Sequence, residues 1–183
     1  MKVLIVYYSQ TGNTKKIAEA IYEVTSQNHD THLKNLKEVK VDDLNYYDLV
    51  FLGSACHSAD LAPPVLKFLE KTPTSPGFKL AGFFTHSVTP FEGSEINKAF
   101  YEKWAGKCSK TFEKTKTEKK VDFKGYFRCR GAPSPAIEEF IHKSIITDEN
   151  EFQEYVEEAR KHPDETDIED AKKFAQETLK ISL

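Results

Sequence analysis

The chain has 183 residues, of which 39% are hydrophobic and 12% aromatic, and this is enough to build the core of one domain. Its formal net charge of −3 is uneven: residues 1–130 carry 20 basic and 15 acidic side chains, whereas residues 131–183 carry 6 basic and 14 acidic ones. This charge balance gives no case for a nucleic-acid-binding protein. No apolar run approaches the ~20 residues that a membrane helix needs, and the N-terminus lacks the layout of a signal peptide. We therefore expect a cytoplasmic protein.

Three cysteines are scattered along the chain, at Cys56, Cys108 and Cys129. They form no C-x-x-C pair and no Cys/His ligand spacing, so neither a zinc nor an iron–sulfur site is predicted. In a cytoplasmic protein we expect these thiols to be reduced.

The opening segment has the clearest pattern in the chain. Residues 3–8 are apolar and rich in β-branched side chains, which predicts a strand buried on both faces. Residues 9–14 are small or polar, and helical spacing of apolar residues follows, which predicts a helix over about residues 12–26. The segment is therefore a strand, a tight turn and a helix N-terminus.

Such a turn can bind an anion. The first N–H groups of a helix lack partners and carry the positive end of the helix dipole. Ser9, Thr11 and Thr14 add hydroxyl donors, and Gly12 lets the backbone approach closely. Because no Lys or Arg lies inside the turn, we expect neutral donors to hold a phosphate monoester. The alternative is an ordinary turn in which Thr11 or Asn13 caps the helix.

The turn lacks the G-x-x-x-x-G-K-(S/T) pattern of nucleoside triphosphate sites and the G-x-G-x-x-G pattern of dinucleotide sites. It resembles instead the (S/T)-x-T-G-x-T phosphate signature of the flavodoxin family, in the residues Ser9-Gln10-Thr11-Gly12-Asn13-Thr14. The resemblance implies a short-chain-like flavodoxin whose loop wraps the ribityl phosphate of FMN. In element order it covers about residues 1–130, and the residues beyond form an additional C-terminal helical extension.

The middle of the chain alternates between strands and helices. The predicted strands are residues 30–36, 48–54, 79–85 and 121–129, the first a weak edge strand. Residues 42–44 predict a turn or one helical turn. A helix begins at Pro63 and Pro64, and another carries the stripe Ile96, Ala99, Phe100 and Trp104. Residues 107–124 are polar and rich in Lys, which predicts a solvated helix end and loop.

The last 50 or so residues predict three amphipathic helices. Their apolar stripes are Ile137, Phe140, Ile141 and Ile145; Phe152, Tyr155, Val156 and Ala159; and Ile168, Ala171, Phe174, Ala175 and Leu179. Asp148 with Glu151, and Thr166 with Glu169, have the spacing of helix caps. One helix must cover the sheet beside the first helix of the chain. The others either pack on the domain, which we favour because short isolated helices are marginal, or bind a partner.

Strands that alternate with helices imply an α/β fold with a parallel sheet and right-handed crossovers. We therefore expect a three-layer, flavodoxin-like, doubly wound sheet of five parallel strands in the order 2-1-3-4-5, with extra C-terminal helices. Residues 1–183 would then form a single domain, with a core at about residues 1–147 and a helical extension at about residues 148–183.

A flavin ring should lie where the loops 9–14, 54–61 and 85–93 meet. The predicted cofactor-binding residues are Ser9, Gln10, Thr11, Gly12, Asn13, Thr14, Ser54, Ala55, Cys56, His57, Thr85, His86, Ser87 and Phe91. The family usually stacks a Trp or Tyr on the ring, and this chain offers only Phe91 beside the two histidines. Phe91 is the best stacking candidate, and a core position is the alternative.

The two histidines and Cys56 leave several roles open. His57 or His86 would supply positive charge or a proton near the flavin, or else be solvent-exposed loop residues. Cys56 is either a reactive thiolate or an inert, half-buried thiol, and Cys129 is expected in the core. No catalytic side chain and no metal ligand is predicted from spacing.

Three functions fit these patterns. The first is an FMN-binding electron carrier between redox partners such as ferredoxin-like proteins or flavin reductases, and we favour it over a stand-alone enzyme. The second is an FMN-dependent NAD(P)H:quinone-type oxidoreductase, which the acid-poor ring loops favour. The third is a flavin-free interaction module, which the missing aromatic favours and the three turn hydroxyls oppose. No nucleic-acid or membrane partner is expected, and the oligomeric state stays open.

Overall fold

The computed structural model describes residues 1–88 and 95–182. Five parallel strands form a sheet in the order β2-β1-β3-β5-β6, and β4 adds a short antiparallel pairing to β3. The strands are β1 (Lys2–Tyr7), β2 (Asp30–Asn35), β3 (Leu49–His57), β4 (Asp60–Leu61), β5 (Lys79–His86) and β6 (Asp122–Arg130). The predicted order 2-1-3-4-5 is confirmed, with β5 and β6 as the fourth and fifth parallel strands.

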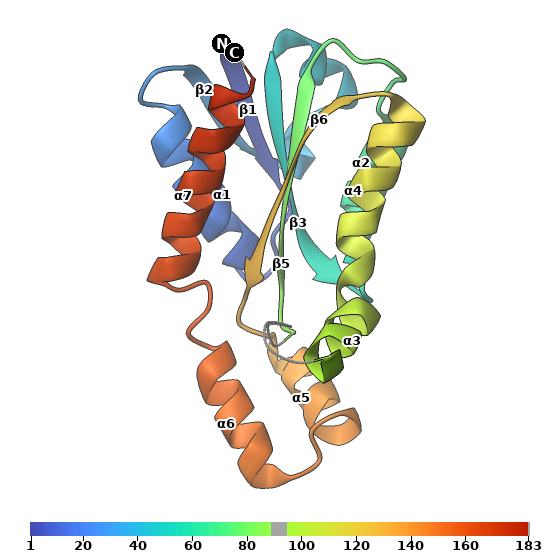
Figure 1. The fold of residues 1–183 in the computed structure, drawn as a ribbon, viewed down its shortest axis with the longest axis vertical. Coiled ribbons are helices and arrows are strands. Elements are labelled where there is room, and N and C mark those ends of the chain that lie inside the picture. Colours follow the sequence, from blue (N-terminus) through green and yellow to red (C-terminus); the bar gives the residue numbers. More distant parts are fainter. Residues whose placement is uncertain (89–94, 183) are drawn as a thin grey trace.

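Helices cover both faces of the sheet (Figure 1). They are α1 (Asn13–Thr25), α2 (Pro63–Lys71), α3 (Glu95–Trp104), α4 (Gly106–Lys119), α5 (Pro135–Ser144), α6 (Glu149–Ala159) and α7 (Glu165–Lys180), with short 3-10 turns at Leu36–Glu38 and Val41–Tyr46. One face carries α1 and α7, and the other carries α2 and α4. Helices α3, α5 and α6 lie beyond the carboxyl ends of the strands, at the lower end of Figure 1.

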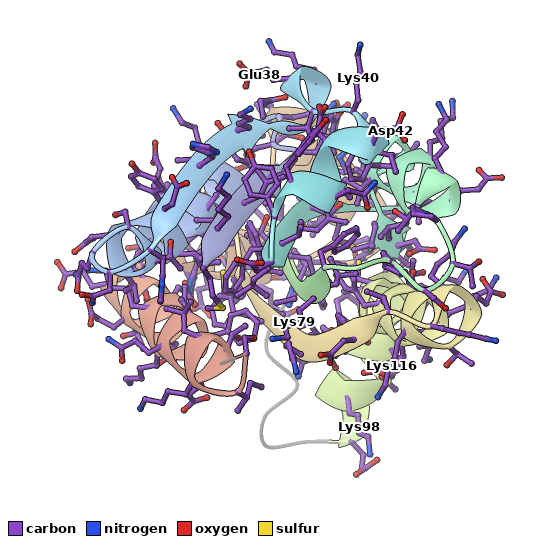
Figure 2. The ribbon with its side chains drawn as sticks, turned by 90° about the horizontal axis from the view of Figure 1, so that it is seen from above. Glu38, Lys40, Asp42, Lys79, Lys98 and Lys116 are labelled. Atoms are coloured by element: carbon purple, nitrogen blue, oxygen red, sulfur yellow. The ribbon has the colours of Figure 1, made fainter. Side chains whose placement is uncertain are left out.

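The central strands are apolar on both sides because both sides are covered. In β1, Leu4 and Val6 face the core under α2 and α4, whereas Val3 and Ile5 face the core under α1 and α7. The strand β3 alternates in the same way. The charged side chains of Glu38, Lys40 and Asp42, which follow the carboxyl end of β2, point outward from the molecule, as Figure 2 shows.

The prediction for residues 107–124 is wrong, because most of this segment is the packed helix α4. Cys108, Phe112 and Thr115 lie on one face of α4 and are buried. The Phe112 ring stacks on Phe123 at 5.9 Å and covers Gly82, where a Cβ atom would lie 2.7 Å from the ring. The buried face of α4 is narrow and contains one large apolar residue. The sequence pattern of this segment is therefore set mainly by its many lysines, which is why it was predicted to be solvated.

The loop predicted over residues 54–61 is also wrong in part. The strand β3 continues to His57 and pairs with β4 through Cys56–Leu61 and His57–Asp60. The turn between them consists of Ser58 and Ala59, whose φ angles of 48° and 70° lie in the left-handed region. Two-residue hairpin turns usually contain Asn or Gly at these positions, and this turn contains neither, so the hairpin was not predicted.

The three predicted C-terminal helices are present and pack within the chain. Helix α7 lies beside α1 and buries Ala171 and Ala175 against the sheet. The predicted cap at Asp148 is confirmed, since its carboxylate accepts from two N–H groups of α6. The predicted Thr166–Glu169 cap is wrong, because the N-cap of α7 is Asp164, two residues earlier, in the capping box Asp164–Asp167.

Helices α5 and α6 form a pair that is attached to the sheet. Arg160 makes two hydrogen bonds, of 2.8 and 2.7 Å, to the carboxylate of Glu138, and Phe152 and Val156 pack on Ile141. The hydroxyl of Tyr155 in α6 donates to the backbone carbonyl of Ser87, just after β5, at 2.6 Å. No helix in the described part of the chain is long and apolar enough to cross a bilayer.

We expect Phe112→Ala to lower the free energy of unfolding by about 3–5 kcal/mol, because the ring is fully buried between α4 and the sheet. The exposed Lys107→Ala in the same helix should change it by less than about 0.5 kcal/mol. Urea unfolding followed by circular dichroism measures both. Equal stabilities of the two variants would contradict the placement of α4.

Candidate functional site

The turn between β1 and α1 leaves the start of the helix open. Gly12 is the N-cap residue, with a φ angle of 94°, and no side chain caps the helix. The first turn contains no acidic residue that would compete for the free N–H groups. This is the arrangement in which a helix N-terminus receives an anion.

Two hydroxyl groups of the turn keep a proton to donate. The Gly12 N–H donates to Ser9 Oγ at 3.1 Å, and the Asn13 amide donates to Thr11 Oγ1 at 3.1 Å. In both bonds the hydroxyl is the acceptor, so its own O–H is still available. The turn therefore presents backbone and hydroxyl donors without any cation.

Thr14 has a different position from the other hydroxyl residues. Its side chain is 1% exposed, and its Oγ1 shares a hydrogen bond of 2.9 Å with Thr85 Oγ1 near the end of β5. This bond ties the start of α1 to the third predicted loop. The Thr14 hydroxyl is therefore used in a hydrogen bond inside the protein. In the Thr14–Thr85 pair one hydroxyl donates its proton, and the other hydroxyl keeps its own.

A cleft of about 350 Å³ lies at the carboxyl ends of the strands. It brings together nine of the predicted residues from all three loops, namely Gln10, Thr11, Asn13, Ala55, Cys56, His57, Thr85, His86 and Ser87. Ser54 lies below the cleft, where its hydroxyl donates to the Ala55 carbonyl and accepts from the Ala62 N–H. Phe91 lies outside the described residues, so its stacking role stays a prediction.

A fourth loop completes the cleft, and the sequence analysis missed it. Gly131, Ala132, Pro133 and Ser134 follow β6 and line the cleft with the start of α5. The Asn13 amide donates to the Ala132 carbonyl at 2.8 Å, and a Cβ atom at Gly131 would lie 2.8 Å from that amide. The run of small residues and prolines after the last strand was the available signal, because loops at the carboxyl ends of neighbouring parallel strands meet.

His57 lies at the end of β3, half-buried in the cleft. The edge of its ring faces Tyr8, with the ring centroids 6.0 Å apart. Burial lowers the pKa of His57 below its usual value of 6.5. Its imidazole is therefore mainly neutral at pH 7.

His86 ends β5 and is 8% exposed, so the solvent-exposed alternative does not hold for it. Burial, followed by the positive charges of Arg128 and Arg130, lowers the pKa of His86 to about 3. Its Nδ1 atom has no hydrogen-bond partner among the described residues. His86 is therefore a neutral imidazole at pH 7 and supplies no positive charge to the cleft.

The thiols at this end of the sheet are held by backbone carbonyls. Cys56 Sγ lies 3.5 Å from the Trp104 carbonyl oxygen, and Cys108 Sγ lies 3.8 Å from that of Ala59. A hydrogen bond with the Cys56 thiol, together with burial, raises the pKa of Cys108, and burial raises that of Cys129. Cys108 and Cys129 are therefore unreactive, as expected for thiols in the core.

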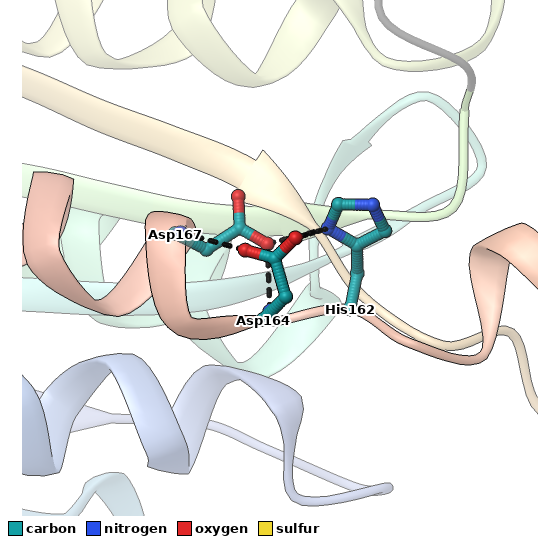
Figure 3. Close-up of side chains that lie close together, drawn as sticks. All are labelled: His162, Asp164 and Asp167. Atoms are coloured by element: carbon teal, nitrogen blue, oxygen red, sulfur yellow. Dashed lines mark hydrogen bonds and ion pairs between the residues drawn. The ribbon is translucent and has the colours of Figure 1, made fainter.

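A charged cavity of about 380 Å³ lies on the other side of His86. His162 Nδ1 lies 2.5 Å from Asp167 Oδ2, and Asp164 and Asp167 bond each other's backbone N–H groups (Figure 3). One imidazole and two carboxylates are donors that suit a divalent cation, and their ligand atoms lie within 4.8 Å of one another. Arg128 and Arg130 line the same cavity and oppose a cation there, so the cluster serves as the cap of α7.

A family model described as a flavodoxin domain matches residues 4–176. The chain belongs to the flavodoxin family. The match includes the turn at residues 9–14, all strands except the start of β1, and most of α7, so the resemblance that the turn suggested extends well beyond residue 130.

Similar proteins cover the whole chain. An uncharacterized protein of Methanocaldococcus jannaschii is 31% identical over 181 residues, covering 98% of this chain and 99% of that protein. The flavodoxin-like domain-containing protein BilS of Clostridioides difficile is 28% identical, covering 98% of this chain and 97% of that protein. Oxidised flavodoxin 1 of Bacillus cereus has the same fold, with a TM-score of 0.65, 16% identity and 98% coverage of both chains.

The low pKa of His86 predicts a pH dependence of this flavodoxin domain's stability. Between pH 6.5 and about 3 the unfolded state binds a proton at His86 and the folded state does not, so acid favours unfolding. From pH 7 to pH 5, His86 alone should lower the free energy of unfolding by about 2 kcal/mol. Urea unfolding of the wild type and of His86→Gln at both pH values measures the difference, and parallel losses in the two proteins would contradict it.

Proposed function

We propose that this protein binds FMN and carries electrons between redox proteins. The observation that carries the proposal is the open start of α1, where free N–H groups lie in the same turn as the Ser9 and Thr11 hydroxyls and Thr11 lines one edge of the cleft. A phosphate dianion matches such a set of neutral donors. Flavodoxin-family membership supports the same cofactor, because the family typically binds FMN.

The residues present fit that cofactor. The turn would hold the phosphate, and the backbone of residues 55–58 and 85–87 would line the ring, while the loop from Gly131 to Ser134 limits access of water. FMN, when bound, supplies the redox chemistry, and the protein orients it and sets its electrostatic surroundings. With His57 and His86 mainly neutral, these surroundings lack a cationic imidazole near the ring.

The surface around the cleft suits a carrier that meets other proteins. Exposed carboxylates gather on α5 and α6, which lie at the same end of the molecule, at Glu139, Glu149, Glu151, Glu154, Glu157 and Glu158. Such a surface steers partners that present basic residues. We propose redox proteins of that kind as partners, and residues 1–183 as one functional domain.

The colour of the purified protein tests the cofactor. We expect a yellow protein that releases FMN when it is denatured, and whose flavin is reduced through a partner reductase. A colourless protein that takes up no added FMN would overturn the proposal and favour an interaction module. Rapid oxidation of NAD(P)H by the yellow protein alone would favour a stand-alone oxidoreductase.

The phosphate assignment has its own test. Thr11→Val removes one hydroxyl donor to a charged group, and we expect FMN affinity to fall by roughly 10- to 100-fold. Quenching of FMN fluorescence measures the affinity. Thr117→Val in α4, where the hydroxyl bonds only the Glu113 carbonyl on the surface, is the matched control. If the Thr11 variant binds FMN as the wild type does, the turn does not hold the phosphate.

A further inference from the structure

A groove of about 930 Å³ lies next to the turn between β1 and α1. It is formed by residues 8–10 of that turn, by the two 3-10 turns that follow β2, and by α2. Gln10 lines both the groove and the cleft, so the two spaces are neighbours. Tyr8 lines the groove, and its ring contacts His57 of the cleft. A partner in the groove would therefore lie close to a flavin bound in the cleft.

The rim of the groove is basic. Four exposed lysines line it from two sides, namely Lys37 and Lys40 after β2, and Lys67 and Lys71 on α2. Asp42 is the one acidic residue among the described lining residues. The acidic residue of α2 that is nearest in sequence, Glu70, lines a different pocket with residues of α4. The groove therefore has an excess of positive charge, although the chain as a whole is negative.

These four lysines form no ion pair with any residue that the structure describes. Other lysines pair with a carboxylate one helical turn away, as Lys15 does with Glu19 and Lys114 with Glu118. Lys67 and Lys71 instead have each other at that spacing, and like charges four residues apart destabilise a helix slightly. Carboxylates from outside the chain would remove this repulsion, so the groove favours a negatively charged occupant.

The floor of the groove is apolar. Leu36, Val39 and Phe68 line the groove and are buried, and Tyr8 and Val41 line it and are half-buried. An apolar centre surrounded by a charged rim is the usual arrangement of a protein–protein interface. The groove can therefore gain contact area at its centre and attract a partner through its rim.

The donors in the groove suit carboxylates of a protein better than the phosphates of a nucleotide. The described lining contains no arginine, which is the side chain that binds phosphate in a bidentate manner. Helix α2 begins with Pro63 and Pro64, and prolines have no N–H group to offer to an anion. The lysine ammonium groups are compact charges on flexible stems, and such groups pair with carboxylates that are spread over a surface.

We propose that this groove is the docking surface for a partner protein that presents carboxylates around an apolar contact. The docking stands on the groove, whereas electron transfer with this partner rests on the proposed function. The acidic helices α5 and α6 contribute no residue to the groove. The protein therefore has two docking surfaces of opposite charge, so that one redox partner would reduce the bound flavin and a partner of the other charge would reoxidise it.

The test measures binding of two fluorescein-labelled polymers to the full-length protein by fluorescence anisotropy. Poly-L-glutamate represents the carboxylates, and a copolymer of glutamate and tyrosine adds apolar groups. We expect saturable binding of both polymers, which weakens as the salt concentration rises because the rim charges are exposed. The copolymer should bind more tightly, since its rings can contact the apolar floor.

Paired variants locate the binding. Lys67→Gln together with Lys71→Gln removes two charges of the rim, and we expect the affinity for both polymers to fall about fivefold. Lys110→Gln together with Lys114→Gln is the matched control, because these two lysines have the same spacing on α4 and lie outside the groove lining. The control should bind the polymers as the wild type does.

Several outcomes would overturn the assignment. They are unsaturable binding, equal affinities of the groove variant and the control, or equal binding of the two polymers. Tighter binding of ATP than of the copolymer, lost in the groove variant, would make the groove a nucleotide site instead. Groove-dependent polymer binding by a protein that takes up no FMN would keep the docking surface and remove the proposed electron-transfer function, so the two proposals fail in different ways.

Discussion

The parallel arrangement of the strands is the constraint on which the rest of the molecule depends. Because β1, β3, β5 and β6 all run in one direction, each ends at the same edge of the sheet, and the loops that follow them meet there. Both faces of the sheet must be covered for this arrangement to be stable, and α1 with α7 and α2 with α4 provide the cover. With both faces covered, the loops at the ends of the strands remain for binding, and the cleft lies at the carboxyl ends.

The α5–α6 pair changes the character of this edge. The loop from Gly131 to Ser134 brings a fourth wall to the cleft, and α5 and α6 enclose an apolar cavity beside it. The Tyr155–Ser87 hydrogen bond fixes the pair to the end of β5. The same segment carries the acidic excess of the sequence, so it adds both an apolar interior and an acidic exterior to the flavodoxin-domain scaffold.

Strong periodic patterns made much of the fold readable from the sequence. The sequence pattern matched the observed element in three places, namely residues 3–8, the turn at Gly12 and the three apolar stripes of the tail. The order of the strands was then predicted from the alternation of strands and helices. The helix α4 was missed because Phe112 is its one large buried side chain, and the Ser58–Ala59 hairpin because it lacks glycine and asparagine.

The properties of the site depend on tertiary contacts that no local pattern encodes. Tyr101 of α3 packs on the His86 ring, and the charges of Arg128 and Arg130 in β6 lower its pKa, and these three residues are distant in sequence from the loop that was considered for it. The bond from Asn13 to Ala132 joins residues 119 positions apart. The residues at the cleft could therefore be named from the strand ends, but their protonation and mutual bonding could not.

The buried hydroxyl pair of Thr14 and Thr85 has a mechanical consequence. It links the first turn of α1 to the residue that directly precedes His86, through one bond that water does not reach. An anion held at the helix start, as proposed above, would therefore contact an element that is bonded to the end of β5. Replacing either hydroxyl with a methyl group would therefore leave the other one buried without this partner.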